Sequence, residues 1–454
     1  MTGRALAAID RDRLAVLLER EVGRFRADHP RSLELHQRSK GSLLFGVPMS
    51  WMSRWAGGFP VYLDEAKGAR VRDVDGHEYV DLCLGDTGAM AGHAPQPVVR
   101  AIGIQAERGA TAMLPTEDGA WIGEELARRF GLPLWQFALT ATDANRWALR
   151  LAREVTGRTK ILVFDWCYHG SVDEALAATQ HGVVGPRLGN VGPAIHPALT
   201  TKVVQFNDLY ALEQALEPGD VACVLAEPAL TNIGIVLPED GFHEGLRNLT
   251  RETGTLLAID ETHTLSAGPG GCTRAWGLEP DLVTVGKAIG GGMPAAAYGV
   301  TAELAERIAG RTEADYEDVG GIGGTLAGNA LSLAATRATL EHVLTEQAYE
   351  RTIPLAERFA SDARAAIEQH GLPWHVTELG CRAEYRFRPE PPRDGAEAAA
   401  AVDPELEQYM HLHALNRGVL LTPFHNMALM CPATTEADVE AHGEAFRAAL
   451  QELV

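Results

Sequence analysis

The chain has 454 residues, which is too long for one simple core and predicts two domains. Apolar residues make up 46% of it and charged residues 22%, as in an ordinary globular protein. The formal net charge is −21 and no basic stripe is present, which argues against nucleic acid and against an anionic membrane surface as partners.

The cysteines and the N-terminal sequence indicate where in the cell the protein is expected. No two of the six cysteines are spaced as C-x-x-C, which argues against a zinc knuckle or a redox motif. The first residues, "MTGRALAAIDRDRLAVLLEREVGRFR", predict an amphipathic charged helix rather than a signal peptide. No apolar run is long enough to span a bilayer. We therefore expect a cytoplasmic protein with reduced cysteines.

The N-terminal part, residues 1–75, is predicted to hold this helix, an active-site loop and part of a small domain. The helix should end near Ala27–Pro30, and the loop is "GSLLFGVPMSWMSRWAGGFP". The alternating pattern on either side of "DG" in "ARVRDVDGHEYVDL" then predicts a β-hairpin. Helices should follow between about 94 and 130.

Residues 76–335 are predicted to form a large α/β domain. From about residue 134 to 300, short apolar runs alternate with helical segments, as in "KILVFD", "ACVLAEP" and "LLAID". Runs that are apolar on both faces suit a parallel sheet buried between helices. Ligands bind at the carboxyl ends of such strands. The polar residues at these ends are Asp165, Asn207, Glu227, Asp260 and Lys287.

Residues 336–454 are predicted to form a smaller α/β domain. It opens with a long helix, continues with a second αβ segment near 373, and ends in a C-terminal helix. The stretch "PEPPRDGAEAAAAVDPE" (389–405) is rich in proline and acids and predicts a surface loop.

Two of the strand ends suggest specific chemistry. Lysine is scarce, with only five in the chain, and Lys287 lies in "VTVGKAIGGGMP" among small residues that leave space for a ligand. Pyridoxal phosphate enzymes need a lysine for the aldehyde and a carboxylate at the pyridine nitrogen. Lys287 and Asp260 at successive strand ends would supply both. The plainer interpretation of Lys287 alone is a surface lysine at a strand end.

Further residues suit the same cofactor. Thr140, Ala141 and Thr142 stand at the start of an amphipathic helix, where a phosphate could bind, although a threonine there is usually only an N-cap. Tyr168 and His169, in "WCYHGS", follow another strand and could stack on a flat ring.

Six motifs occur in order from about residue 60 to the C-terminus: "DVDGHEYVDL", "YHG", "AEP", "IDETHT", "VGKAIGGGMP" and "GGTLAGNALSLAA". Through them the chain resembles the class III pyridoxal-phosphate aminotransferases of fold type I, and within them the glutamate-1-semialdehyde aminomutase-like branch. The resemblance implies a large domain with a mostly parallel sheet between helices, a smaller α/β domain, pyridoxal 5'-phosphate as cofactor, and a homodimer with its active site at the subunit interface.

The resemblance also implies roles for the matching residues. Lys287 would form the Schiff base and move the proton, and Asp260 would pair with the pyridine nitrogen. Tyr168 would stack on one face of the ring, with His169 beside it in the same motif. Glu227 would help to orient the site.

The remaining matches lie on the other side of the cofactor. Thr262 would pack on the second face of the ring, and Thr325 would reach the phosphate from the neighbouring subunit. His263 would lie near the phenolic oxygen, or would simply be a satisfied buried histidine. Relatives carry a glycine where this chain has Ala141, so we expect a phosphate cup of different shape.

The residues that bind the substrate are less clearly indicated by the sequence. The loop "LLTPFHNMALMCPATT" lacks the arginine that would bind a keto acid. Arg386 is a candidate, but its alternation with Arg382 and Arg388 favours a solvated strand edge. The aromatic residues that suggest an apolar pocket, or equally an interface core, include Trp51, Trp55 and Phe424.

These observations predict an aminotransferase that moves an amino group from an amine or amino acid, with a bulky apolar group, to a keto acid. The alternatives on the same fold are an intramolecular aminomutase, a lyase or a racemase. A more remote alternative is a hydrolase that holds a divalent metal with Asp260, Glu261 and His263. Alternation along a strand opposes it, because adjacent carboxylates point to opposite sides. We therefore expect no metal.

Overall fold

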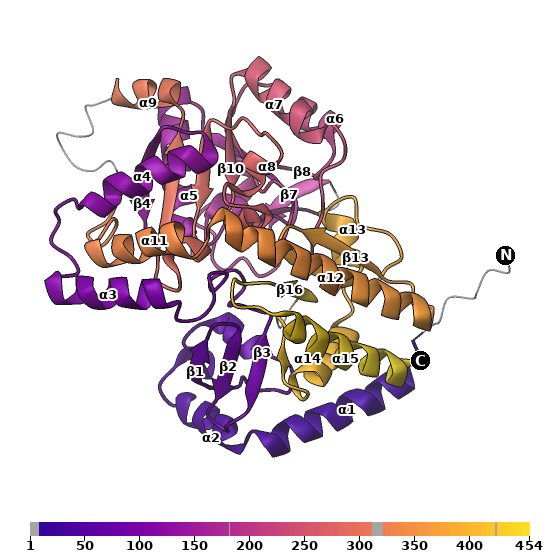
Figure 1. Ribbon diagram of the computed structural model, residues 1–454. Coiled ribbons are helices and arrows are strands. Elements are labelled where there is room, and N and C mark those ends of the chain that lie inside the picture. The colour runs from indigo at the N-terminus through magenta and orange to yellow at the C-terminus, as the bar shows by residue number, and fades with distance from the viewer. Residues whose placement is uncertain (1–8, 181, 311–320, 423–424) are drawn as a thin grey trace. The chain divides into compact units, whose positions relative to one another are not determined.

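The computed structural model describes residues 9–180, 182–310, 321–422 and 425–454 (Figure 1). The chain divides into two compact units. The terminal unit contains Met1–Pro95, Gln347–Pro391 and Ala401–Val454, and the central unit contains Gln96–Glu346 and Pro392–Ala400. The division differs from the predicted boundaries in three places: residues 76–95 belong to the terminal unit, 336–346 to the central unit, and 392–400 return to the central unit.

The central unit is built on a seven-stranded sheet (Figure 1). Its strands, in spatial order, are β4 (Leu134–Ala138), β12 (Ala296–Val300), β11 (Leu282–Val285), β10 (Leu256–Asp260), β9 (Val221–Ala226), β5 (Lys160–Phe164) and β8 (Thr201–Val204). Only β12 runs against its neighbours, β11 and β4. The predicted α/β fold with a mostly parallel sheet is confirmed.

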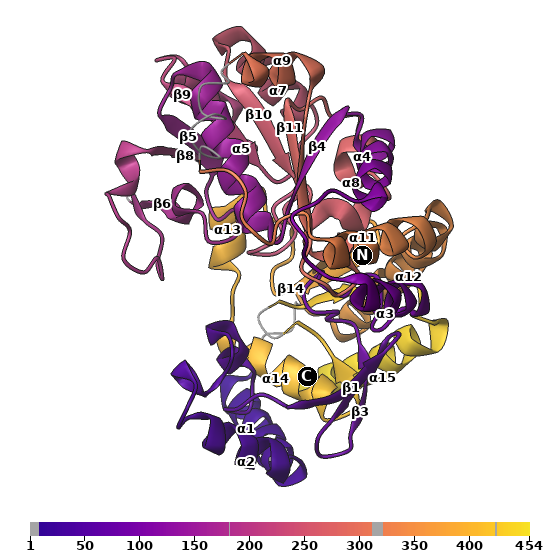
Figure 2. The same ribbon diagram turned by 90° about the vertical axis from the view of Figure 1, so that its left-hand side faces the viewer.

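Helices cover both faces of this sheet; α5 lies on one side and α4 and α8 on the other (Figure 2). The helices of the central unit are α3 (Gln96–Arg108), α4 (Glu117–Phe130), α5 (Ala141–Thr156), α6 (Leu209–Leu216), α7 (Phe242–Thr253), α8 (Gly271–Ala275), α9 (Ala302–Ala309), α11 (Ala330–His342) and α13 (Gly395–Ala400). A small hairpin, β6 (Ala177–Gln180) and β7 (Val183–Pro186), lies beyond the main sheet.

Helix α5 matters most for the site. Thr140 caps it by accepting a hydrogen bond from the backbone N–H of Asp143, and Gly157 ends it in the left-handed conformation. Ala144, Ala148 and Ala152 recur every fourth residue on its buried face, and the helix packs across β9, β10, β11 and β12. The first turn of α5 therefore has a fixed position relative to the strand ends.

The terminal unit contains two smaller sheets. One has β1 (Leu63–Lys67), β2 (Arg70–Asp73), β3 (Glu78–Asp81) and β15 (Val419–Leu420), and the other β13 (His375–Leu379), β14 (Arg382–Arg386) and β16 (Met427–Leu429). The helices are α1 (Arg11–Asp28), α2 (Pro30–Ser39), α12 (Glu346–His370), α14 (Pro404–Leu415) and α15 (Glu436–Leu453). The predicted hairpin around Asp75 and Gly76 is confirmed, because β2 and β3 pair antiparallel.

Two predictions need correction. The stretch 389–405 is not simply a surface loop, since it contains α13, whose Gly395 and Ala398 are buried in the central unit. Its proline- and acid-rich composition concealed a short helix that packing stabilises. The long helix expected after about 335 is two helices, α11 and α12, separated by residues 343–345.

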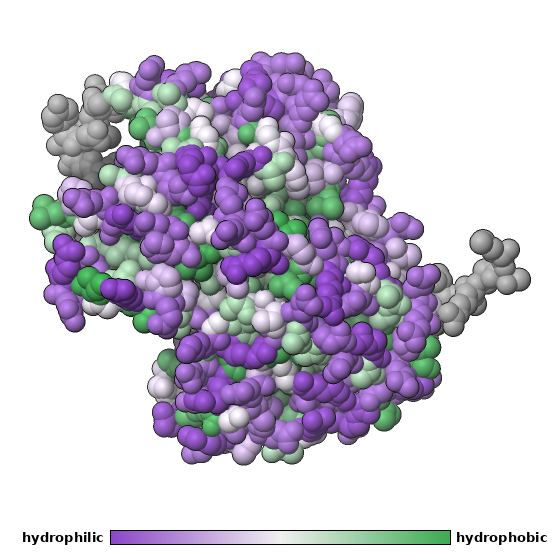
Figure 3. Space-filling model, in the orientation of Figure 1, coloured by the Kyte–Doolittle hydropathy of each residue, from purple (hydrophilic) through white to green (hydrophobic). Residues whose placement is uncertain are grey.

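No helix in the described part of the chain is long and apolar enough to cross a membrane. The surface facing the viewer of Figure 1 is mainly hydrophilic, with scattered hydrophobic residues (Figure 3).

Arg129 closes the C-terminal end of α11. Its side chain is 2% exposed and donates hydrogen bonds to the carbonyl oxygens of Leu340 (2.8 Å) and Leu344 (2.9 Å). Its Nε also donates to Glu125 at 2.7 Å. The last carbonyls of a helix have no intrahelical partner, so this guanidinium satisfies groups that burial would otherwise leave unpaired.

We predict that Arg129→Met lowers the free energy of unfolding by about 3 kcal/mol, because buried carbonyls and Glu125 lose their partner. The matched control is Arg128→Met. The neighbouring Arg128 side chain is 54% exposed and forms a surface ion pair with Glu125, so its loss should cost under about 1 kcal/mol. Urea unfolding followed by circular dichroism measures both, and equal destabilisation would contradict this account.

Candidate functional site

The predicted strand ends meet at one edge of the central sheet. Asp260 pairs in register with Thr284 of the neighbouring β11, and Lys287 follows Thr284 by three residues. Lys287 has a φ of 48°, a left-handed conformation that side chains rarely adopt and that is often found at functional sites. A Cβ added to Gly286 would lie 3.0 Å from the Cβ of Ala141, so the lysine turn packs directly against the first residue of α5.

Asp260 is buried, and both of its carboxylate oxygens have polar contacts. Its Oδ2 accepts a hydrogen bond from Asn145 Nδ2 at 2.8 Å and lies 2.9 Å from His169 Nδ1, and its Oδ1 accepts from the backbone N–H of Thr262 at 3.0 Å. Burial raises the pKa of this carboxyl, but the interactions with His169, Thr262 and Asn145 outweigh it and lower the pKa to about 2. Asp260 is therefore an anion at neutral pH.

His169 is the cationic partner of this anion. Burial lowers the pKa of His169, but Cys167 and the Asp260 carboxylate outweigh burial and hold it well above its ordinary value. Both side chains are almost completely shielded from water. The pair places a fixed negative charge at the end of β10 that can face a protonated ring nitrogen.

Asn145 was not predicted from the sequence, yet it joins the parts of the site. Its Nδ2 donates to Asp260 and, at 3.2 Å, to the carbonyl oxygen of His169, while its Oδ1 accepts from the hydroxyl of Thr284 at 2.7 Å. It is fully buried on α5. One amide thus connects α5, β10, β11 and the loop after β5. The available signal was a polar residue on the otherwise apolar buried face of a helix.

Glu227 supports the loop that carries Tyr168. Its Oε1 accepts from the backbone N–H of Tyr168 at 3.0 Å, and its Oε2 accepts from the hydroxyl of Thr231 at 2.6 Å. Burial raises the pKa of Glu227. The Tyr168 side chain, in contrast, is 38% exposed beside the buried pair, where an aromatic ring could contact a flat ligand.

The start of α5 offers backbone N–H groups rather than threonine hydroxyls. Thr140 is occupied as the N-cap and donates to Asp143 Oδ2 at 2.8 Å, and Thr142 Oγ1 accepts from the backbone N–H of Ser171 at 3.1 Å. The first N–H groups of a helix have no intrahelical partner and favour an anion such as phosphate. Gly170 approaches so closely that a Cβ there would lie 2.1 Å from Thr142 Oγ1.

Ala141 bears on the predicted change in the shape of the phosphate cup, which stays a prediction. Ala141 is the first residue of α5 and does not have a positive φ, so alanine is well suited to the position. The missing glycine therefore imposes no strain at this point of the backbone.

Lys287 and His263 are in direct contact. Lys287 Nζ lies 2.8 Å from His263 Nε2, and the histidine is only 7% exposed. Two other buried atoms nearby, Thr262 Oγ1 and His169 Nε2, have no hydrogen-bond partner among the described residues. Buried polar atoms are normally paired, so these two suit a bound polar ligand. Together with the anionic Asp260, which suits a protonated ring nitrogen, and the start of α5, which suits a phosphate, these atoms are compatible with bound pyridoxal phosphate.

The alternative metal site is not formed. Glu261 turns into the structure, where its carboxylate accepts from the hydroxyls of Thr264 and Thr273 and from the backbone N–H groups of Cys272 and Thr273. It thereby anchors the start of α8. Within the described ranges, Asp260, Glu261 and His263 do not form a group able to hold a metal ion.

The roles predicted for the other residues stay predictions. Thr325 is exposed in the loop before α11, and its role remains a prediction. Trp51 and Trp55 belong to the terminal unit, where Trp55 packs against the apolar cluster around Phe25. Trp51 lies in the 3-10 turn Ser50–Arg54 and is 38% exposed. Phe424 lies outside the described residues.

The expectation that Arg382 and Arg386 lie on a solvated edge is wrong. They are 1% and 3% exposed, because β14 is the middle strand between β13 and β16. Glu384 lies between them on the same strand and its Oε1 is 3.5 Å from Arg386 Nη1. A buried counter-charge, which the alternation pattern could not reveal, makes this burial tolerable.

Comparison with known proteins gives a consistent result. Residues 51–450 match the family model described as "Aminotransferase class-III". Over 432 residues the chain is 35% identical to a glutamate-1-semialdehyde 2,1-aminomutase of Desulfitobacterium hafniense, covering 93% of this chain and 98% of that protein.

Solved structures are similar as well. A glutamate-1-semialdehyde-aminomutase from Pseudomonas aeruginosa PAO1 is 50% identical with a TM-score of 0.96, covering 99% of this chain and 100% of that one, and a second structure under that name is in complex with PMP. A β-phenylalanine aminotransferase from Variovorax paradoxus is 25% identical with a TM-score of 0.86, covering 96% of this chain and 97% of that one.

We predict that Asn145→Ala weakens the binding of pyridoxal phosphate about tenfold, because the carboxylate of Asp260 loses one charge-assisted hydrogen bond. Thr284→Val, which removes only the hydroxyl that holds Asn145, should have a smaller effect in the same direction. Fluorescence titration of the cofactor-free protein measures the affinity. The control is Asn248→Ala, an exposed position on α7. If Asn145→Ala binds the cofactor as tightly as the wild type, Asn145 contributes only to packing.

Proposed function

Because this chain belongs to the class-III aminotransferase family, whose members depend on pyridoxal phosphate, we propose that it moves an amino group with Lys287 as the reacting amine. One observation carries this assignment. The only lysine at the strand-end cluster lies 2.8 Å from His263 and follows the strand that pairs with β10, which ends in the buried anion Asp260.

In this proposal each residue has one task. Lys287 Nζ would hold the cofactor through its aldehyde carbon and would carry the proton to and from the substrate carbon. Asp260 keeps the ring nitrogen protonated, while His169 and Asn145 hold Asp260 as an anion in a fixed position. When bound, the cofactor supplies a protonated ring that accepts the electrons of the carbon losing its proton.

The rest of the site would bind and orient. Tyr168 would lie against one face of the ring and Thr262 against the other, and the backbone N–H groups at Ala141 and Thr142 would hold the phosphate. We propose that Thr325 of a second copy completes the phosphate site in a homodimer. Exposed apolar side chains that such an interface would cover include Leu326, beside Thr325, together with Met113 and Leu114.

For the reaction, we propose the intramolecular transfer of a glutamate-1-semialdehyde 2,1-aminomutase. Relatives with this name are 35% to 50% identical over nearly the whole chain. Such a shift moves the amine from C2 to C1 of one molecule and yields 5-amino-4-oxopentanoate without an external keto acid. The same lysine and carboxylate also serve intermolecular transfer, and the similarity to the β-phenylalanine aminotransferase supports a transaminase acting on a bulky apolar substrate as the second candidate.

Substrate incubations separate the two reactions. We expect the purified enzyme to convert glutamate-1-semialdehyde to 5-amino-4-oxopentanoate through many turnovers with no keto acid present, and Lys287→Ala to be inactive. A transaminase given β-phenylalanine would instead stop after one turnover with the cofactor aminated, and would resume on addition of pyruvate. Liquid chromatography of the products and the absorbance of the bound cofactor distinguish these results. Failure to turn over glutamate-1-semialdehyde would contradict the aminomutase assignment.

His263 provides a second test at the lysine. We expect His263→Phe to lower kcat at least about tenfold, since it removes a hydrogen-bond partner of the Lys287 amine. His263→Gln, which can still accept a hydrogen bond, should retain more activity. Both variants should change the pH at which the absorbance of the bound cofactor shifts. If the pH titration and turnover of His263→Phe match those of the wild type, His263 has only a packing role.

A further inference from the structure

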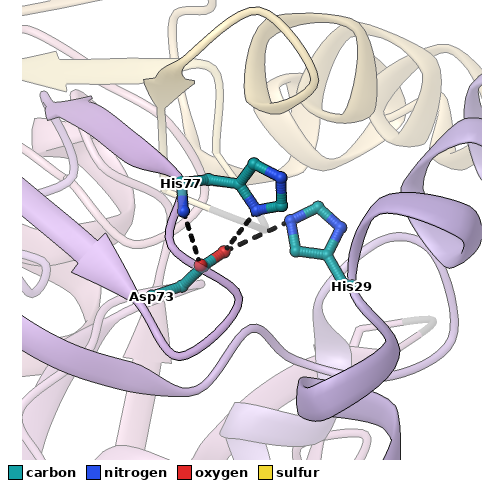
Figure 4. A group of neighbouring side chains, drawn as sticks. All are labelled: His29, Asp73 and His77. Atoms are coloured by element: carbon teal, nitrogen blue, oxygen red, sulfur yellow. Dashed lines mark hydrogen bonds and ion pairs between the residues drawn. The ribbon is translucent and has the colours of Figure 1, made fainter.

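We propose that His29, Asp73 and His77, in the terminal unit, form a binding site for a divalent transition-metal ion, with zinc as the best fit (Figure 4). The three residues come from the end of α1 and from the β2–β3 hairpin. All three residues belong to the terminal unit, whereas the residues of the cofactor cluster belong to the central unit.

The two aspartates of "DVDGHEY" have different partners. Asp75 caps the start of α2, because its carboxylate accepts from the backbone N–H of Arg31 (2.7 Å) and from the backbone N–H (3.0 Å) and hydroxyl (2.6 Å) of Ser32. Asp73 Oδ1 closes the hairpin turn by accepting from the backbone N–H groups of Asp75 and His77, both at 2.9 Å. This leaves Asp73 Oδ2 directed at the two histidines.

The distances suit a metal. Asp73 Oδ2 lies 3.3 Å from His29 Nε2 and 3.2 Å from His77 Nδ1, and the three atoms lie within 4.8 Å of one another. Zinc binds nitrogen and oxygen ligands at about 2.0–2.1 Å, which places neighbouring ligand atoms of a tetrahedron about 3.3 Å apart. Figure 4 shows both imidazole rings directed at this carboxylate oxygen.

The proton positions favour a cation between these groups. His29 Nδ1 lies 2.6 Å from the carbonyl oxygen of Phe25, which can only accept, so Nδ1 carries a proton. In the neutral ring the lone pair of Nε2 then faces a carboxylate oxygen. The hydroxyl of Tyr79 reaches both groups, but it has one proton and donates it to Asp73 at 2.6 Å. In the neutral ring, Nε2 therefore has a lone pair that can bind a metal ion or accept the hydroxyl proton of Tyr79, 2.8 Å away.

The surroundings favour the metal. A histidine whose second nitrogen is held by a backbone carbonyl is the usual support for a metal ligand. No lysine or arginine in the described ranges forms an ion pair with Asp73, and Asp75 adds negative charge nearby. His29 and Asp73 are buried, whereas the His77 side chain is 41% exposed, which leaves a side open for metal entry and a water ligand. Two histidines and one carboxylate with an open position are typical zinc ligands.

A second group with metal-like spacing, Glu21, His413 and Glu452, differs in this respect. Arg20 forms ion pairs with both glutamates, and Arg417 lies 3.2 Å from Glu21. Guanidinium groups already neutralise these carboxylates, so the group has no need of a metal ion.

The test is zinc binding by the complete, cofactor-loaded protein. After dialysis against a chelator, calorimetric titration with zinc sulfate and elemental analysis should give one zinc per chain with micromolar or tighter affinity, and magnesium should not bind. His77→Asn can keep a hydrogen bond to Asp73 but removes the ligand nitrogen, so zinc affinity should fall at least tenfold. His77→Ala should behave alike. The matched control, His342→Ala, removes an exposed histidine beside Glu341 in the central unit and should change nothing.

Zinc should also raise the melting temperature of the wild type but not of the His77 variants. Two results would overturn the proposal. One is a wild type that binds no zinc, which would leave these side chains as a hydrogen-bonded cluster. The other is zinc binding of unchanged affinity in both His77 variants.

Discussion

The negative charge of Asp260 is the constraint on which the site depends. A buried carboxylate alone would take up a proton, because burial raises its pKa. Here His169, Asn145 and the backbone N–H of Thr262 reverse that effect, and the pKa falls to about 2. The anion can exist only if α5, β10 and the loop after β5 keep their relative positions. The folding of the central unit and the chemistry of the cluster therefore rest on the same hydrogen bonds.

Much of this site could be predicted from the sequence. Apolar runs with polar ends indicated parallel strands, and such strands bring their carboxyl ends to one edge, so Asp260, Glu227 and Lys287 could be named in advance. The hydrogen-bond partners could not. Asn145 is one polar residue on a buried helix face, and no pattern in the sequence says which acid it will meet. Strand β12, in the alanine-rich run at 296–300, also lacks a strong strand signal.

Burial of charge was the main source of error. Alternating arginines on β14 suggested a solvated edge, but the strand is central and Glu384 lies between them. The acidic stretch 389–405 contains a helix, α13, that packs through the uncharged residues Gly395 and Ala398. In both cases tertiary contacts supplied what local composition lacked, which sequence patterns do not report.

The family assignment fixes the cofactor more firmly than the reaction. One lysine and one carboxylate can serve mutases and transaminases alike, so substrate and reaction type depend on residues around the ring. His263 lies 2.8 Å from Lys287, so in the proposed reaction it is placed to influence the proton transfer.

The protonation state of the bound cofactor tests the account most directly. Nuclear magnetic resonance of the enzyme loaded with pyridoxal phosphate carrying 15N in the ring reports whether that nitrogen holds a proton. The account predicts a protonated nitrogen throughout the neutral pH range in the wild type, and loss of that proton in Asp260→Asn. An unprotonated nitrogen in the wild type, or a protonated one that persists in Asp260→Asn, would contradict it.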